Sequence, residues 1–297
     1  MTIVDTTTPA TTEEMTYALP MQHDVALFHR AFDMPDLILT PGPLPLDRID
    51  LRIKLIREEG VKELREAIEE RDAVKIVDAL IDTVYVALGA LVEMGYRVDE
   101  QLGLDQPRSV DALTGSLLNL GLGNASSTEL YLALLEPAFR RQDLERAAGI
   151  LQAITTGAIL TLLKSGIDPR PFFDVVQSSN MSKLGIDGRP VHSRGEELDG
   201  EPLGKVLKGP NYVRAEIGLA QAFQTLYGDP RAFLEYFKVS DDFARGARAA
   251  ADAMRFYFLD ENEHPLYAIT AGDLESHERD AVTDVLRAEQ NRLELAE

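Results

Sequence analysis

Apolar side chains recur every three or four positions through most of this chain, and this helical period limits its fold more than any other feature. In residues 72–94, Ile76, Leu80 and Leu91 fall on one face of a single helix. The same period marks residues 22–33, 46–70, about 214–227, 229–259 and 272–295. No segment keeps up the alternation of apolar and polar residues that a half-buried strand shows. We therefore predict an all-α helical bundle.

Charge and composition exclude several classes of function. The formal net charge of −20 over 297 residues argues against unaided binding to nucleic acid or to an anionic membrane. It does not exclude a nucleotide substrate, because a metal ion can invert the local charge. The chain has no cysteine, which excludes disulfides, thiolate zinc sites and cysteine nucleophiles. The histidines form no pair at the spacing of zinc ligands, so zinc is not expected.

The N-terminus and the length of the apolar runs bear on localisation. No apolar run reaches the ~20 residues that a membrane span needs. The first residues, MTIVDTTTPATTEE, lack the basic start and apolar core of a signal peptide. We expect a cytoplasmic protein with a flexible tail at residues 1–16.

Two segments align without a gap when the chain is shifted by 71 residues, so that 62–95 lies over 133–166. The matched pairs include Ala67 with Ala138, Asp72 with Asp143, Leu80 with Leu151, Ala87 with Ala158, Leu91 with Leu162 and Gly95 with Gly166. The loop position, the helix lengths and the terminal glycine, a typical C-terminal cap, all correspond. We interpret the two segments as an internal repeat. Pro137, which falls on Glu66, is expected to kink the second copy.

Acidic residues depart from this common frame. The four correspondences are Glu59 with Leu130, Glu63 with Leu134, Asp78 with Gly149 and Asp82 with Ala153. The helical pattern survives in the second copy although the acids are lost. This is expected if the acids serve chemistry rather than the fold.

The spacing of the acids indicates a metal site. Glu59 and Glu63 are four residues apart, as are Asp78 and Asp82, so each pair shares one helix face. Helices joined by a short turn near residues 71–72 run antiparallel, which lets the two pairs face each other. Carboxylates held so close repel unless protons or cations intervene, and hard oxygen donors suit Mg²⁺ or Mn²⁺. An acid on a helix more often lies on a solvated face. Residues 78–92, however, contain no Lys or Arg, and acids in so apolar a helix are costly unless they hold a cation.

Residues 184–213 are rich in glycine and proline, lack a helical period and are typical of a long loop. Lysines beside glycines in such a loop are natural phosphate contacts, although loops of this composition also occur without a ligand. The segment SSNMSK and the loop GKVLKGPNY supply Asn180, Lys183, Lys205, Lys208, Asn211 and Tyr212. On the first helix, Phe28, His29 and Phe32 could border a base, although such residues more often belong to a core.

These motifs resemble the MazG-like, all-α NTP pyrophosphohydrolase superfamily, and within it the phosphoribosyl-ATP pyrophosphohydrolase-like proteins of phages and bacteria. The matching segments are LIREEGVKELREAI, VDALIDTVYVALGALVEMGY, FFDVVQSSNMSKLGIDGRPV and GKVLKGPNY, within about residues 22–95 and 172–214. The resemblance implies a site with Mg²⁺, or Mn²⁺, bound by Glu59, Glu63, Asp78 and Asp82. It also implies phosphate contacts from Lys183, Lys205 and Lys208, and nucleotide contacts from Asn180. From the chemistry of the reaction, Glu59 or Glu63 could orient the attacking water as general base. We add Phe28, His29, Asn211 and Tyr212 to the expected nucleotide contacts.

The implied reaction is hydrolysis of a (d)NTP to the (d)NMP and pyrophosphate. Two alternatives stay open: another pyrophosphate-linked nucleotide such as phosphoribosyl-ATP, and a catalytically silent nucleotide-binding protein of the same fold. Gly60 stands where the family motif EExxE has its second glutamate, which leaves the number of bound metal ions open.

Compact members of the superfamily lack a second helical copy and often build the site from dimers. We therefore expect the degenerate repeat to replace one partner, giving a pseudo-dimer within one chain, with a homodimer as the other assembly. The expected divisions are a tail at 1–16, repeat 1 at 17–100, repeat 2 at 101–183, a phosphate-binding loop at 184–213 and C-terminal helices at 214–297.

Overall fold

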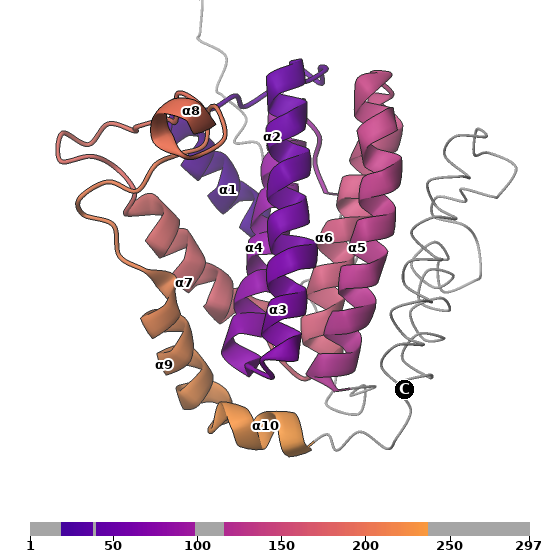
Figure 1. The fold of residues 1–297 in the computed structure, drawn as a ribbon, viewed down its shortest axis with the longest axis vertical. Coiled ribbons are helices and arrows are strands. Elements are labelled where there is room, and N and C mark those ends of the chain that lie inside the picture. The colour runs from indigo at the N-terminus through magenta and orange to yellow at the C-terminus, as the bar shows by residue number, and fades with distance from the viewer. Residues whose placement is uncertain (1–18, 38–39, 99–115, 237–297) are drawn as a thin grey trace, which may run out of the picture.

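The computed structural model describes residues 19–37, 40–98 and 116–236 (Figure 1). The helices are α1 (Pro20–Ala31), α2 (Leu46–Arg57), the π-helix η1 (Glu58–Glu63), α3 (Leu64–Glu69), α4 (Ala73–Met94), α5 (Leu117–Arg140), α6 (Leu144–Lys164), α7 (Pro169–Met181), α8 (Glu196–Asp199), α9 (Ala215–Tyr227) and α10 (Pro230–Tyr236). No strand occurs in these ranges, where His192 and Val206 form an isolated antiparallel bridge. The prediction of an all-α protein is confirmed. The predicted tail, the helix at 272–295 and most of that at 229–259 lie outside the described residues.

Helix α4 is the centre of the bundle. It packs against α1, α2, α3, α5, α6, α7, α9 and α10, and most of its side chains are buried. Asp72 caps its N-terminus by accepting hydrogen bonds from the backbone N–H groups of Val74 and Lys75. Gly95 ends it at φ 76°, where a Cβ atom would lie 2.2 Å from the carbonyl oxygen of Leu37. The predicted glycine cap is therefore confirmed. The close approach of the backbone at Leu37 explains why this position needs glycine.

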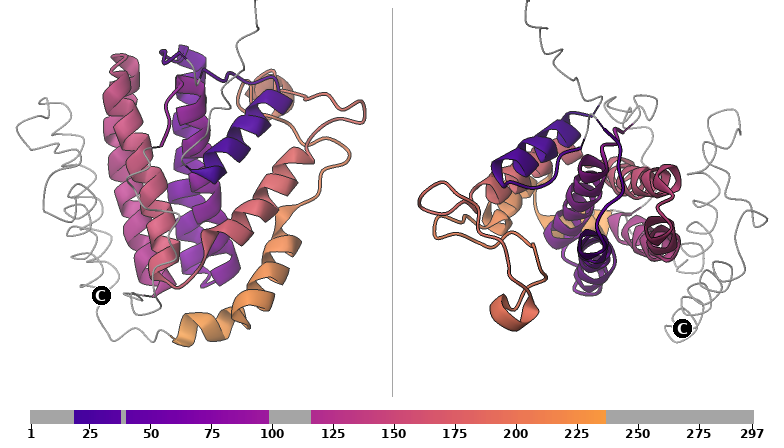
Figure 2. Two further views of the ribbon diagram at one scale, coloured as in Figure 1. Left: turned by 180° about the vertical axis from the view of Figure 1, so that it is seen from behind. Right: turned by 90° about the horizontal axis from the view of Figure 1, so that it is seen from above.

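The remaining helices form two flanks around α4. On one flank, α2, η1 and α3 run end to end and lie beside the hairpin of α5 and α6 (Figure 1). On the other flank, α7 and α9 pack against each other and against α4. In the right panel of Figure 2, which looks along the long helices, these two flanks lie apart. The acid-bearing segments η1 and α4 thus lie between the second hairpin and the C-terminal helices.

The two hairpins share one frame at the shift of 71 residues. Helix α4 begins at Ala73 and α6 at Leu144, and each is capped by the aspartate that precedes it. The residues before those caps, Arg71 and Gln142, both adopt positive φ, at 52° and 57°. Helix α5 packs against α2, η1 and α3, and α6 packs against α4. Residues 117–164 therefore contact the acid-bearing helices, as a pseudo-dimer within one chain requires, while the domain boundaries stay a prediction.

Two features of this second hairpin bear on the sequence-based expectations. Helix α5 continues past Pro137 to Arg140, so the proline lies in the last turn and does not end the helix there. Among the described helices, α6 alone is long and apolar enough to cross a membrane by length and composition. Most of its apolar side chains are buried in the bundle, as in the core helix of a globular protein.

The segment between α7 and α9 leaves the bundle and returns to the same place. Its two arms pair through Ser193 N–H to Lys205 O at 2.8 Å and Leu207 N–H to Val191 O at 2.8 Å, with the single turn α8 at the tip. Gly209 closes the base of this excursion by donating to Lys183 O at 3.0 Å. A Cβ atom at Gly209 would lie 2.7 Å from that oxygen. The predicted long loop is present, and it has a defined internal pairing.

Candidate active site

A cavity of about 370 Å³ opens between η1, α4, α7, α9 and the loop that precedes α9. It collects nearly every candidate residue from segments far apart in the sequence. The candidates that line it are Phe28, His29, Glu59, Glu63, Asp78, Asp82, Asn180, Lys183, Lys205, Lys208 and Tyr212. The structure thus brings the predicted acids, lysines and nucleotide contacts to one place, and their roles remain predictions.

Asn211 and Phe32 do not take part in this cavity. Asn211 is exposed and does not line the cavity, because it lies in a turn closed by a hydrogen bond from Tyr212 N–H to Gly209 O at 3.1 Å. Phe32 is fully buried and stacks on Phe28, with ring centroids 4.2 Å apart. A nucleotide in this cavity would therefore meet Phe28 rather than Phe32, and Asn211 would face solvent.

The four acids line one cavity, and the pKa values of Glu59, Asp78 and Asp82 are raised there. Burial and the charges of Asp82, Glu63 and Asp78 raise the pKa of Glu59 to about 9. Burial and the neighbouring carboxylates raise the pKa of Asp78 to about 8. Burial also raises the pKa of Asp82, to about 6, against the attraction of the Lys183 ammonium. Such a cluster holds protons in the absence of a cation, and a cation can replace them.

The carboxylate of Glu59 has a buried oxygen atom that lacks a hydrogen-bond partner. Its Oε2 atom is buried and makes no hydrogen bond, although a buried carboxylate oxygen is costly without one. Within the described residues, no three Asp, Glu or His side chains lie close enough to form a ready-made metal site. The acids therefore fit a hard divalent cation by donor type, charge and the unpartnered oxygen. A bound ion would have to draw them together.

The backbone that carries Glu59 and Glu63 is a π-helix rather than an α-helix. Residues 58–63 form η1, between the α-helical turns of α2 and α3. Such segments are rare, and they occur frequently at functional sites because they redirect side chains inside an otherwise regular helix. The α-helix α5 occupies the corresponding positions of the second copy and carries no such segment.

Gly60 faces away from this site. A Cβ atom there would lie 2.9 Å from Thr128 Cγ2 and 3.2 Å from Thr83, and Gly60 does not line the cavity. A glutamate at this position would enter the packing between α4 and α5. Glu58 does not replace it, because its side chain binds Lys62 at 2.6 Å and lies outside the cavity. The absence of the second motif glutamate therefore leaves no gap in the cavity wall.

This geometry predicts the outcome of restoring the family motif. The variant Gly60→Glu is expected to lower the free energy of unfolding by at least about 3 kcal/mol, because a charge would be buried against two threonines. It is not expected to raise turnover. Urea unfolding and nucleotide turnover of Gly60→Glu, with Gly60→Ala as the control for crowding alone, would check this. Higher turnover in Gly60→Glu would mean that position 60 faces the site.

Lysines cover the acids from the side of α7 and the loop. Lys183 donates to Asn180 Oδ1 at 2.5 Å, and burial lowers its pKa against the attraction of Asp82. Lys208 lies 4.9 Å from the ring centroid of Tyr212. Lys205 pairs with Glu201 at 2.8 Å and helps to hold down the pKa of Glu59. The cavity therefore offers ammonium groups opposite a cluster of acids, as binding of a metal-complexed phosphate chain needs.

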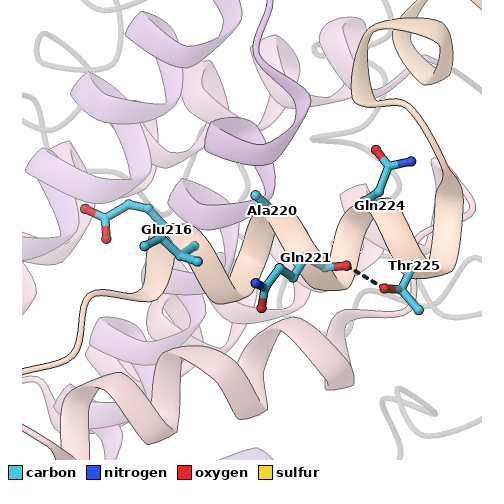
Figure 3. A pocket seen from close by; sticks show the side chains of 6 residues that line it. Glu216, Ala220, Gln221, Gln224 and Thr225 are labelled. Carbon is cyan, nitrogen blue, oxygen red and sulfur yellow. Dashed lines mark hydrogen bonds between the residues drawn. The ribbon is translucent and has the colours of Figure 1, made fainter.

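Glu216, at the start of α9, is a further acid that the sequence did not single out. It lines the cavity, and its charge raises the pKa of Asp78 and Asp82. It also borders an open groove along α9 together with Ile217, Ala220, Gln221, Gln224 and Thr225 (Figure 3). In the sequence, one feature links Glu216 to the site: it follows the motif GKVLKGPNY, which ends at Tyr212, by four residues.

The opposite end of the cavity is built on a buried ion network. Glu93 is fully buried and binds the guanidinium groups of Arg52, at 2.9 Å, and Arg48. Burial alone would raise the pKa of Glu93, and the two guanidinium groups instead lower it to about 2. Arg52 also reaches His29, with 3.2 Å between Nη2 and Nε2. Arg52 and His29 line the cavity, and the network fixes their side chains.

Comparison with known proteins bears on the first part of the chain. Residues 25–102 match the family model described as phosphoribosyl-ATP pyrophosphohydrolase. The matched segment includes η1 and α4, and with them all four predicted metal ligands. It ends before α5, so the lysines and Glu216 lie outside it. No curated protein and no solved structure matches the chain.

Proposed function

Residues 25–102 belong to the phosphoribosyl-ATP pyrophosphohydrolase family within the MazG-like, all-α superfamily, and from this premise we propose that the chain hydrolyses a (d)NTP to the (d)NMP and pyrophosphate with Mg²⁺. The nucleotide pyrophosphohydrolase activity follows from the family. The choice of a (d)NTP and of Mg²⁺ is our proposal. The observation that carries it is the convergence of four acids and three lysines on one cavity.

The chain's own groups suit hydrolysis of a phosphate anhydride. Glu59, Glu63, Asp78 and Asp82 would hold Mg²⁺, which neutralises phosphate charge and polarises the phosphoryl oxygens when bound. Lys183, Lys205 and Lys208 stand opposite the acids and would bind the phosphates that leave as pyrophosphate. Little covalent chemistry is then needed from the protein, because positioning and charge neutralisation account for most of the catalysis of phosphoryl transfer.

One of the two η1 glutamates would orient the attacking water. Without a cation, burial among acids raises the pKa of Glu59 to about 9, so that its carboxyl holds a proton. A bound cation would lower this pKa and leave the carboxylate free to accept a proton from water. Its unpartnered Oε2 has no competing hydrogen bond to give up. The loop between α7 and α9 covers the lysine side of the cavity and would limit access of bulk water.

Two alternative functions for this cavity also have support. Hydrolysis of phosphoribosyl-ATP is favoured by the description of the matching family. A silent nucleotide-binding protein is compatible with the absence of a ready-made metal site among the described residues. Both would use the same cavity, so a single set of measurements separates all three.

The test is a panel of the common dNTPs and NTPs together with phosphoribosyl-ATP, each incubated with the full chain and Mg²⁺. We expect equimolar pyrophosphate and nucleoside monophosphate, with no activity in EDTA. Release of orthophosphate would contradict cleavage between the α- and β-phosphates. Nucleotide-dependent thermal stabilisation without turnover would support the silent binding protein instead.

A further inference from the structure

Arg52 and Gly89 lie together in the cavity wall, at a distance from the acids that suits the length of a nucleoside. Arg52 precedes Glu59 by seven residues, and Gly89 follows Asp82 by seven, and all four residues line the cavity. Seven residues of α-helix advance roughly 10 Å. A nucleotide with its phosphates at the acids would therefore bring its base to Arg52 and Gly89.

Arg52 is held firmly and still has one nitrogen to offer. Its side chain is 4% exposed. Its Nε donates to Glu93 at 3.1 Å, and its Nη2 lies 2.9 Å from Glu93 and 3.2 Å from His29 Nε2. Within the described parts of the chain, Nη1 makes no hydrogen bond or ion pair.

His29 defines the direction of the bond that it shares with Arg52. Its Nδ1 lies 2.7 Å from the carbonyl oxygen of Pro35 and donates to it, so Nε2 accepts from Arg52. Burial and the nearby guanidinium lower the pKa of His29 to about 4, which keeps the ring neutral. His29 thus positions Arg52, and its two ring nitrogens are already engaged.

Gly89 makes room for the free nitrogen. A Cβ atom at position 89 would lie 2.7 Å from Arg52 Nη1, closer than carbon and nitrogen can pack. The glycine therefore allows Nη1 to lie over the surface of α4 at the cavity wall. No other residue type fits there without moving the guanidinium.

The free nitrogen sets what the ligand must provide. A guanidinium offers donors only, and a donor enclosed with a ligand is costly unless it meets an acceptor. Arg52 shares the carboxylate of Glu93 with Arg48, and the lysines that suit the phosphates lie with the acids. With the phosphates at the acid end, the group that reaches Arg52 is the base, whose acceptors are neutral. Guanine, cytosine, thymine and uracil each carry a carbonyl oxygen with two lone pairs, whereas the acceptors of adenine are ring nitrogens with one lone pair each and its exocyclic group is an amino donor.

We propose that Arg52 recognises the base of the substrate and selects a carbonyl-bearing base over adenine, with Gly89 allowing the contact. The proposal rests on the function proposed above for this cavity. It favours a (d)NTP with such a base over phosphoribosyl-ATP, whose base is adenine.

The test compares kcat/KM for dGTP, dCTP, dTTP, dUTP and dATP in the wild type and in Gly89→Ala. The wild type should prefer at least one carbonyl-bearing base over dATP by about tenfold or more. Gly89→Ala leaves both Arg52 and Glu93 in the chain and improves helix propensity, yet its Cβ displaces the guanidinium from its place at the cavity wall. The preference should fall to about threefold or less, mainly through KM. Gly121→Ala is the matched control and should keep the preference, because Gly121 lies in the second turn of α5, has Ile68 as its nearest neighbour and does not line the cavity.

The outcomes separate this proposal from the proposed function. Equal or better use of dATP by the wild type, or an unchanged preference in Gly89→Ala, would overturn the role of Arg52 while leaving pyrophosphate release in place. Binding of α,β-methylene analogues of the same nucleotides, measured by calorimetry, reads the base preference even if no nucleotide is cleaved. The same order of affinities there, lost in Gly89→Ala, would support base recognition by a protein that is not a hydrolase.

Discussion

Replacing Asp82 with asparagine is expected to lower kcat for pyrophosphate release at least about a hundredfold. Asp82 faces the other three acids and Lys183 from the middle of α4. Loss of its charge would weaken cation binding and leave Lys183 without its closest acidic counterpart. Changes to groups that merely support metal ligands cost 10–100-fold, so loss of a direct ligand should cost more. Steady-state kinetics over a range of Mg²⁺ concentrations is the measurement, with Glu58→Gln as the matched control.

The stability of the Asp82→Asn variant shows whether lost activity comes from the site or from unfolding of the protein. Burial raises the pKa of Asp82 from 3.8 to about 6, so the folded state binds protons more tightly than the unfolded state. Its contribution to stability therefore declines as pH rises from about 4 to about 6, and the ionised form is a burden at neutral pH. Asp82→Asn should be at least as stable as the wild type at pH 7 without cation, and should gain less stability from Mg²⁺. Full turnover in Asp82→Asn would remove Asp82 from the metal site.

Replacing Glu93 with glutamine is expected to lower the free energy of unfolding by about 3 kcal/mol at pH 7. Glu93 is 0% exposed and binds the guanidinium groups of Arg48 and of the buried Arg52. Removal of one member of a buried ion network leaves uncompensated charge in a low-dielectric interior, which typically costs 3–5 kcal/mol. Urea unfolding would measure the change. Glu136→Gln, which breaks an exposed pair with Arg140, should show no measurable change.

The pH dependence of the same protein gives an independent check. The pKa of Glu93 is lowered from 4.5 to about 2 in the folded state, so the unfolded state binds the proton more tightly. The stabilisation is fully present above about pH 4.5 and is lost as pH falls toward 2, by about 3 kcal/mol in total. Glu93→Gln should lack this part of the acid transition. An unchanged acid slope in the variant would mean that other carboxylates account for it.

The sequence predicted the parts of the molecule that depend on local signals. The C-terminal limit of α4 was predicted from Gly95, because a left-handed glycine cap acts within a few residues. The acid pairs were found because spacing of four along a helix fixes a common face. The lysine loop was found by its motif, whose residues converge on the same cavity apart from Asn211.

Contacts between distant segments could not be predicted in this way. The pairing of Arg52 with Glu93 joins residues 41 positions apart, and neither helix shows by its own pattern that a buried charge will be balanced. The direction of Gly60 depends on the π-helical turn, which shifts side chains relative to an α-helix. Glu216 looks like an ordinary acid in the first turn of a helix, and only the packing of α9 on α4 brings it to the cavity.

The closure at Gly209 has a consequence for how this protein can change in length. The excursion after α7 begins and ends at the hydrogen bond between Gly209 and Lys183, and its arms are paired before the chain reaches α8. The entropy cost of closing a loop grows slowly, by about 0.6 kcal/mol for each doubling of its length. Insertions at α8 should therefore be tolerated without displacing Lys205 or Lys208. The tip is the natural place for a reporter or affinity tag, and the place where homologous chains are expected to differ most in length.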